Sequence, residues 1–215
     1  MQSKRNRHDG DSGTPFRTTP RVKYLNRRAC VIEIELKAWI EDPHKTKAII
    51  SDLAVFKHDF EKEDAYWYSS KQDSALPHFG VRVRKETNGD GTHTLVTFKV
   101  KEKRGAVEVN DEKEFEASDS EPLETLLNLL GFRVGARKHK KGWAWTSGDI
   151  TAELCEVHGL GWFVELEILA LSADEQTVKD ARTRLLAFLK KIRVGEDRIE
   201  SRYYTEMLSR LNKEE

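Results

Sequence analysis

The sequence predicts an α+β domain in which antiparallel strands are interrupted by a few helices. Segments with period-two alternation outnumber those with helical spacing, and several follow one another with no helix between them. The turn sequence NGDGT at residues 88–92 joins two of these segments as a hairpin loop would. This order of elements is typical of an antiparallel α+β fold and differs from a βαβ series.

The expected elements run in order from residue 24. Alternation and aromatic content predict strands at 24–41, 58–70, 80–86, 94–103, 132–145, 149–157 and 162–169. Helical spacing predicts helices at 44–56, 120–130, 173–191 and 198–211. In the first helix, Ile49, Leu53 and Phe56 form the apolar stripe, and the preceding Asp42-Pro43 supplies a cap and a first turn.

Composition indicates one domain at residues 23–212, preceded by a flexible tail at residues 1–22 that has almost nothing to bury. The 37 basic residues equal the 37 acidic residues, so no overall charge argues for nucleic acid or a membrane surface. No apolar run approaches the roughly 20 residues that a spanning helix needs. Two cysteines, Cys30 and Cys155, fit buried thiols in a reducing compartment, and we expect a cytoplasmic protein.

Charged residues of one sign recur two positions apart, which places each pair on one face of a strand. The acidic pairs are Glu33/Glu35 and Glu165/Glu167, and the basic pairs are Arg82/Arg84, Lys99/Lys101 and Lys138/Lys140. One such strand alone would be read as a solvated surface, but faces of segregated sign favour a charged ligand. If the strands close into a barrel with these faces inside, the bases neutralise a polyphosphate and the carboxylates hold divalent cations.

The same residue types favour Mg²⁺ or Mn²⁺ over zinc. Carboxylate oxygens suit these ions, whereas neither cysteine lies in a CxxC pair and the seven histidines form no ligand-spaced cluster. The sequence also has no GxxxxGK[ST] loop and no GxGxxG after a strand, which excludes the usual nucleotide-binding folds.

These residues resemble the CYTH, or triphosphate tunnel metalloenzyme, superfamily. Its ExExK hallmark matches Glu33-Ile-Glu35-Leu-Lys37, and the later motifs follow in the family's order. They are RxR (Arg82, Arg84), T[YF]K (Thr97 to Lys99), a KxR-like pair (Lys138, Lys140), a segment like DxVxGLGxFxExE (155–167) and a C-terminal SYxxL-like element (201–208). The resemblance implies a closed antiparallel β-barrel tunnel with flanking helices, which binds triphosphates with Mg²⁺ or Mn²⁺.

Carried over position by position, the resemblance implies a role for each inward-facing residue. The metal ligands would be Glu33, Glu35, Glu165 and Glu167, and the phosphate-binding residues would be Lys37, Arg82, Arg84, Lys99, Lys138 and Lys140. Lys37 and Lys138 would also take part in catalysis. The family's acid is replaced by Cys155, and we hypothesise that Glu153, two residues earlier on the same face, supplies the missing carboxylate.

The resemblance leaves the chemistry open. A class IV type adenylyl cyclase, converting ATP to cyclic AMP and pyrophosphate, is our first interpretation. A tripolyphosphatase or a thiamine or nucleoside triphosphatase is the alternative, and a non-catalytic polyphosphate- or nucleotide-binding module is the third. In each case we expect a small-molecule triphosphate as the partner, with no nucleic acid and no membrane, and we leave a homodimer open.

Overall fold

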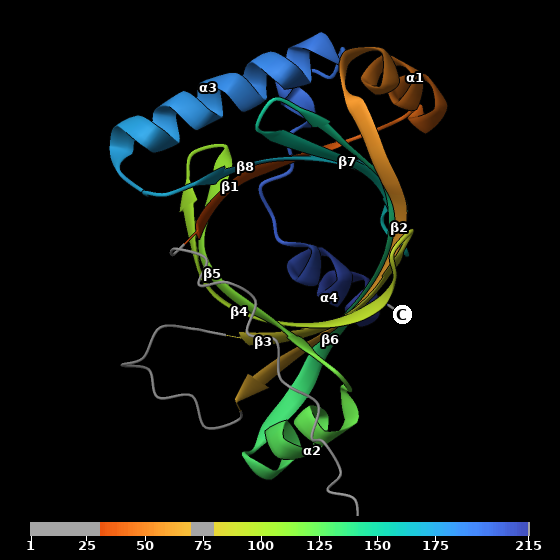
Figure 1. Ribbon diagram of the computed structural model, residues 1–215, viewed down its shortest axis with the longest axis vertical. Coiled ribbons are helices and arrows are strands. Elements are labelled where there is room, and N and C mark those ends of the chain that lie inside the picture. Colours follow the sequence, from red (N-terminus) through yellow and green to blue (C-terminus); the bar gives the residue numbers. More distant parts are fainter. Residues whose placement is uncertain (1–30, 70–79, 215) are drawn as a thin grey trace, which may run out of the picture.

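The computed structural model describes residues 31–69 and 80–214, and within them eight antiparallel strands close into a barrel (Figure 1). The order around the barrel is β1-β5-β4-β3-β2-β6-β7-β8. The strands are β1 (Val31–Trp39), β2 (Val55–Ser69), β3 (Gly80–Asn88), β4 (Gly91–Arg104), β5 (Val107–Ala117), β6 (Phe132–Ser147), β7 (Ile150–Val157) and β8 (Gly161–Ala170). The predicted α+β barrel is confirmed, and the expected tail at residues 1–22 lies outside the described residues.

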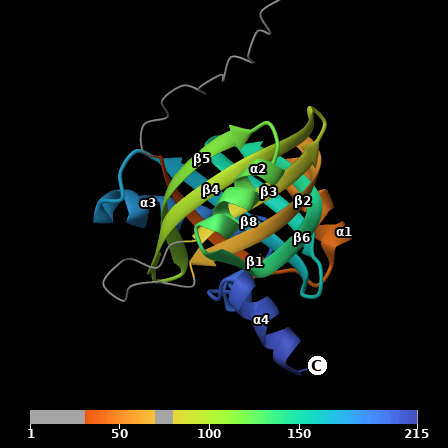
Figure 2. The same cartoon turned by 90° about the horizontal axis from the view of Figure 1, so that it is seen from below.

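Four α-helices and one 3₁₀ turn accompany the barrel in the described part of the chain. They are α1 (Pro43–Leu53), α2 (Glu121–Leu129), α3 (Glu175–Lys191), η1 (Glu196–Arg198) and α4 (Tyr204–Glu214). Figure 1, which looks along the barrel, shows α3 and α1 against one side and α2 on the opposite side. Figure 2 shows α4 beyond one end of the barrel. None of these helices is long and apolar enough to cross a membrane.

The first helix starts where the sequence indicates and ends earlier. The Asp42 side chain accepts a hydrogen bond from the Lys45 backbone N–H, and Pro43 occupies the first turn. The helix ends at Leu53, so Phe56 belongs to β2 and not to the helical stripe. The Phe56 ring packs edge-on against Trp145 with centroids 5.8 Å apart, and this contact between β2 and β6 outweighs the local helical spacing.

Two further elements differ from the sequence prediction. The pattern indicated no strand at β5, because its residues are mostly acidic or polar and their alternation is weak. The last helix begins at Tyr204 and not at residue 198. Residues 199 and 200 instead run alongside the end of β1. Ile199 pairs with Ala38, and the Glu200 N–H donates to the Lys37 carbonyl.

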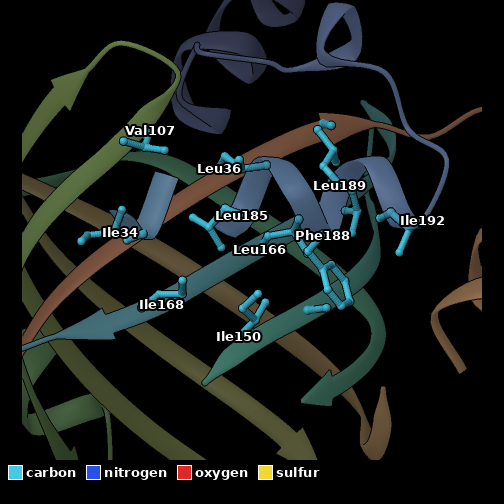
Figure 3. Close-up of a cluster of buried hydrophobic side chains, with 14 of the residues drawn as sticks. Ile34, Leu36, Val107, Ile150, Leu166, Ile168, Leu185, Phe188, Leu189 and Ile192 are labelled. Carbon is cyan, nitrogen blue, oxygen red and sulfur yellow. The ribbon is translucent and has the colours of Figure 1, made fainter. Parts of the chain in front are cut away.

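The main hydrophobic core lies outside the barrel, between the strands and α3 (Figure 3). Ile34 and Leu36 of β1 point toward this core, and Leu185, Phe188 and Leu189 of α3 cover them. Alternation therefore sends Glu33, Glu35 and Lys37 to the barrel interior. A second outer cluster, which includes Trp67, Val83 and Leu127, packs under α2.

One end of the barrel is filled by apolar side chains from the inner wall and from α4. Phe60, Cys155 and Phe163 belong to this cluster together with Tyr204 and Met207 of α4. The Tyr204 and Phe163 rings meet edge to face at 5.0 Å between centroids. The charged part of the interior thus has an apolar floor.

The packing of α3 predicts a large cost for truncating its central leucine. Leu185 is fully buried, so we expect Leu185→Ala to lower the free energy of unfolding by about 2–5 kcal/mol. Urea unfolding followed by circular dichroism measures this change. The control is Leu171→Ala at a residue that is 82% exposed, where the change should stay within about 0.5 kcal/mol. Equal effects in both variants would contradict the position of the core.

Candidate active site in the barrel interior

The inner faces of the strands enclose a cavity of about 320 Å³, which we call the interior cavity. Fifteen of its 21 lining residues are charged. Ten of the predicted site residues line it: Glu33, Glu35, Lys37, Arg82, Arg84, Lys138, Lys140, Glu153, Glu165 and Glu167. The backbone of the eleventh, Lys99, pairs with Glu112 of β5, but its side chain lies outside the described part of the structure.

Several charged residues of the interior were not predicted. They are Lys62 and Asp64 of β2, Glu86 of β3, and Glu108 and Glu112 of β5. Lys62 and Asp64 have opposite charges, so they do not form a pair of one sign. Their two-residue spacing does indicate that both lie on one face of the strand. The β5 acids were missed because the strand itself was not recognised.

Three predicted metal ligands meet at one point of the interior wall. Carboxylate oxygens of Glu33, Glu35 and Glu167 all lie within 4.8 Å of one another. The strand register explains this, since Glu35 of β1 stands opposite Glu167 of β8. We call these three residues the carboxylate triad. Oxygen ligands at this spacing suit a hard divalent cation such as Mg²⁺ or Mn²⁺.

The fourth predicted ligand, Glu165, is engaged with other side chains. One carboxylate oxygen accepts from Lys140 Nζ at 2.6 Å, and the other accepts from Tyr204 Oη at 2.8 Å. Burial raises the pKa of Glu165, but the charge of Lys140 outweighs it and the pKa falls to about 2. Glu165 thus holds Tyr204, the first residue of α4, by a hydrogen bond. It is not one of the three residues of the carboxylate triad.

Glu153 faces the interior cavity and holds two lysines. Its oxygens accept from Lys62 Nζ at 2.7 Å and from Lys140 Nζ at 2.9 Å. Burial opposes ionisation, yet the two lysines keep the pKa of Glu153 well below its usual value. Cys155 is fully buried as a free thiol, its pKa is raised by burial, and its Sγ lies 3.6 Å from Glu165. On β7, therefore, the carboxylate in the cavity belongs to Glu153.

Every base that lines the cavity in the described structure has a carboxylate partner. Lys37 bonds Glu108 at 2.6 Å and Arg82 bonds Glu112 at 3.0 Å. Asp64 lies between two bases in the strand register and contacts both, Arg84 at 2.7 Å and Lys138 at 3.0 Å. At Asp64 the strand register thus places an acid of β2 between bases of both neighbouring strands, an arrangement that favours cross-strand pairing.

Acids outnumber bases around the cavity. Nine carboxylates and six bases are among its described lining residues. The crowding is visible at Glu108, where burial and the nearby Glu35 raise the pKa to about 7 although Lys37 opposes the rise. The excess of buried acid among these described side chains is complementary to added cations, so the donor set fits divalent metal ions.

Comparison with known proteins then decides the family. Residues 31–204 match the CYTH domain. This chain belongs to the CYTH domain family. The family resemblance predicted from the sequence is confirmed, and CYTH proteins are in general enzymes that act on triphosphates.

Individual relatives cover this CYTH domain almost from end to end. The chain is 26% identical over 181 residues to the protein named "Putative adenylate cyclase MJ0240" of Methanocaldococcus jannaschii, covering 82% of this chain and 98% of that protein. The PH1012 protein of Pyrococcus horikoshii is 26% identical, with a TM-score of 0.68, over 81% of this chain and 98% of that one. A Hippeastrum structure, described as having a dominant triphosphatase activity, has the same fold at 18% identity and a TM-score of 0.51, over 76% and 88% of the two chains.

The buried Asp64 predicts a pH-dependent contribution to the stability of this CYTH domain. Burial opposes its ionisation, but Arg84 and Lys138 hold the pKa of Asp64 well below its usual value. We expect Asp64→Asn to lower the free energy of unfolding at pH 7 by about 3–5 kcal/mol, because two buried bases lose their counter-ion.

The sign of the pH dependence follows from the lowered pKa. The contribution of Asp64 is fully present above about pH 4, the ordinary pKa of an aspartate, and is lost as the pH falls toward the folded-state pKa. Denaturant titrations at several pH values should show the gap between variant and wild type narrowing below pH 4. The exposed Asp59 on the same strand gives the control, and Asp59→Asn should show no comparable gap. A gap independent of pH would contradict the assignment.

Proposed function

We propose that this CYTH domain is a divalent-metal-dependent enzyme that cleaves a triphosphate in the interior cavity. The observation that carries the proposal is the convergence of nine carboxylates and six bases on one cavity, with three of the carboxylates within 4.8 Å of one another. A triphosphate is a polyanion, and a cavity whose described lining has more acid than base favours its binding together with cations.

Mg²⁺ or Mn²⁺ would be held first by the carboxylate triad of Glu33, Glu35 and Glu167. When bound, the ion neutralises phosphate oxygens and lowers the pKa of the attacking hydroxyl or water. Glu165, which was also predicted as a ligand, now holds Lys140 and Tyr204, so it would serve first to position these two residues.

The phosphate chain would bind the bases on the opposite part of the wall. Arg82, Arg84, Lys99, Lys138 and Lys140 are proposed to contact phosphate oxygens, as is Lys37. The arginines provide planar two-pronged contacts, while each lysine acts as a point charge. Glu153 holds Lys62 and Lys140 in place, which supports a role for Glu153 in orienting these bases.

Our first candidate reaction is that of a class IV type adenylyl cyclase. The 3′-hydroxyl of ATP attacks the α-phosphorus, and pyrophosphate leaves. Lys37 and Lys138, whose ammonium groups lie 5.3 Å and 5.1 Å from the Tyr204 ring centroid, would stabilise charge on the transferring and leaving phosphates. The name of the Methanocaldococcus relative supports this choice.

A triphosphatase is the second candidate, and the composition of the cavity favours it. The lining residues other than the charged ones are three tyrosines, two threonines and one leucine, so little apolar surface is available for a nucleoside. Inorganic tripolyphosphate has no nucleoside and needs no apolar surface to bind. The same barrel carries a dominant triphosphatase activity in the Hippeastrum protein, although that likeness extends to the fold alone.

One incubation series tests the proposal. The purified protein is incubated with Mg²⁺ or Mn²⁺ and with ATP, tripolyphosphate or thiamine triphosphate, and the products are separated by chromatography. Cyclic AMP with equimolar pyrophosphate identifies the cyclase, and orthophosphate identifies the triphosphatase.

Two variants connect the activity to the cavity. We expect Glu33→Gln and Lys37→Ala each to lower kcat/KM at least about 100-fold, because the first removes a charged ligand of the metal ion and the second removes a positive charge that faces the phosphates. The outward-facing Lys141→Ala on β6 is the control and should retain the wild-type rate. Metal-stimulated turnover that survives in both interior variants would contradict the proposed site. No turnover of any of the three substrates would leave a non-catalytic binding module.

The role of Glu153 is tested separately. Glu153→Gln removes the charge that holds Lys62 and Lys140, and we expect kcat/KM to fall at least about tenfold. Glu156→Gln on the same strand is matched, since Glu156 pairs with Lys141 outside the cavity. If Glu153→Gln changed neither the rate nor its dependence on metal concentration, Glu153 would have no part in the reaction.

A further inference from the structure

Asn110 lies on the inner wall of the barrel and is fully buried. Glu108 and Glu112, two residues before and after it on β5, both line the interior cavity. Val109, between them, belongs to the outer core under α3. Strand alternation therefore places the Asn110 side chain on the cavity side of β5.

Both polar atoms of the Asn110 side chain lack a hydrogen-bond partner among the described residues. Buried amides in native proteins are nearly always paired, because removing them from water without a new partner is costly. A valine or leucine at this position would fill the space without that cost. The Asn110 amide thus offers one acceptor oxygen and two N–H donors to a ligand that binds beside it.

The strand register places this amide beside the carboxylate triad. Asn110 stands directly opposite Glu33, and the next inward residue of β5, Glu108, stands opposite Glu35. Side chains that face each other across antiparallel strands have Cβ atoms about 4.5–5.5 Å apart. Asn110 is therefore an immediate neighbour of one member of the triad, on the side away from Glu167.

We propose that the amide oxygen of Asn110 is a neutral ligand of the divalent cation held by Glu33, Glu35 and Glu167. Side-chain amide oxygens, like carboxylates, are ligands that hard cations accept. A neutral ligand is suited to this wall, because a fourth carboxylate would increase the repulsion among the acids that already crowd it. The proposal rests on the metal site of the proposed function, but it concerns binding of the ion and not the reaction.

A purely structural role makes a different prediction. If Asn110 only supported the fold, its replacement would destabilise the metal-free protein and leave the affinity for metal unchanged. As a ligand, it contributes nothing to the metal-free protein, and its loss appears when the ion is added.

The test compares Mn²⁺ binding and thermal stability in wild type, Asn110→Leu and Asn110→Ala. Mn²⁺ affinity is measured by titration with electron paramagnetic resonance detection of free Mn²⁺, and melting temperatures are measured with and without Mn²⁺. We expect the dissociation constant to rise at least about tenfold in both variants, as for other residues that support a metal site. The metal-free melting temperature of Asn110→Leu should equal or exceed that of the wild type. Asn110→Ala removes the same oxygen without added bulk and decides the question if leucine does not fit.

The control is Asn128→Leu, because the exposed Asn128 amide donates to the Glu124 carbonyl on α2, which lies on the side of the barrel opposite β1 and β8 (Figure 1). Its Mn²⁺ affinity should match the wild type. An Mn²⁺ affinity within twofold of wild type in the folded Asn110 variants would overturn the inference, as would a wild type that binds no Mn²⁺. If the wild type binds Mn²⁺ but cleaves no triphosphate, the proposed function fails and the role of Asn110 stands.

Discussion

The pairing of buried charges inside the closed barrel is the constraint on which the rest of this structure depends. Fifteen charged side chains line one small cavity, and each would be costly to bury alone. Ion pairs across the cavity wall offset this cost, and Asp64, for example, lies between Arg84 and Lys138. Because charge occupies much of the inside of the barrel, most of the hydrophobic stabilisation comes from the outside. The core under α3 supplies it, and this explains why the apolar side of β1 faces outward.

The same constraint explains the position of α4. A charged cavity open to water at both ends would be strongly screened, and its ion pairs would be weak. The apolar floor of Phe60, Phe163 and Met207 closes one end, and the Tyr204 hydroxyl reaches from α4 to Glu165. That hydrogen bond joins the closing helix to a carboxylate that also holds Lys140. The position of the helix that closes this end of the barrel and the orientation of Lys140 thus both depend on Glu165.

Local spacing predicted the strand faces that line most of the cavity, whereas closure of the strands into a barrel was implied by the resemblance to the CYTH family. Two charges of like sign, two residues apart, mark one strand face, and that rule is sufficient for Glu33, Arg82 and Lys138. It does not indicate which strands are neighbours, so the pairing of Asp64 with bases on both sides could not be predicted. Nor does it reveal that the Asn110 amide has no hydrogen-bond partner among the described residues, because that depends on the assembled wall. The strand β5 and the start of α4 were missed since long-range pairing, and not periodicity, determines them.

The pairing of the bases also constrains how a triphosphate can bind. If a triphosphate binds as proposed, its oxygens replace the carboxylates that hold Lys37, Arg82 and Lys140 in the described cavity. A displaced carboxylate left buried without a partner would be costly, so displacement is favourable only if the freed acids gain cations. Divalent ions held by the carboxylates Glu33, Glu35 and Glu167 would provide that compensation. On the proposed function, the binding of metal and the binding of triphosphate are therefore strongly coupled, because each ligand favours the binding of the other.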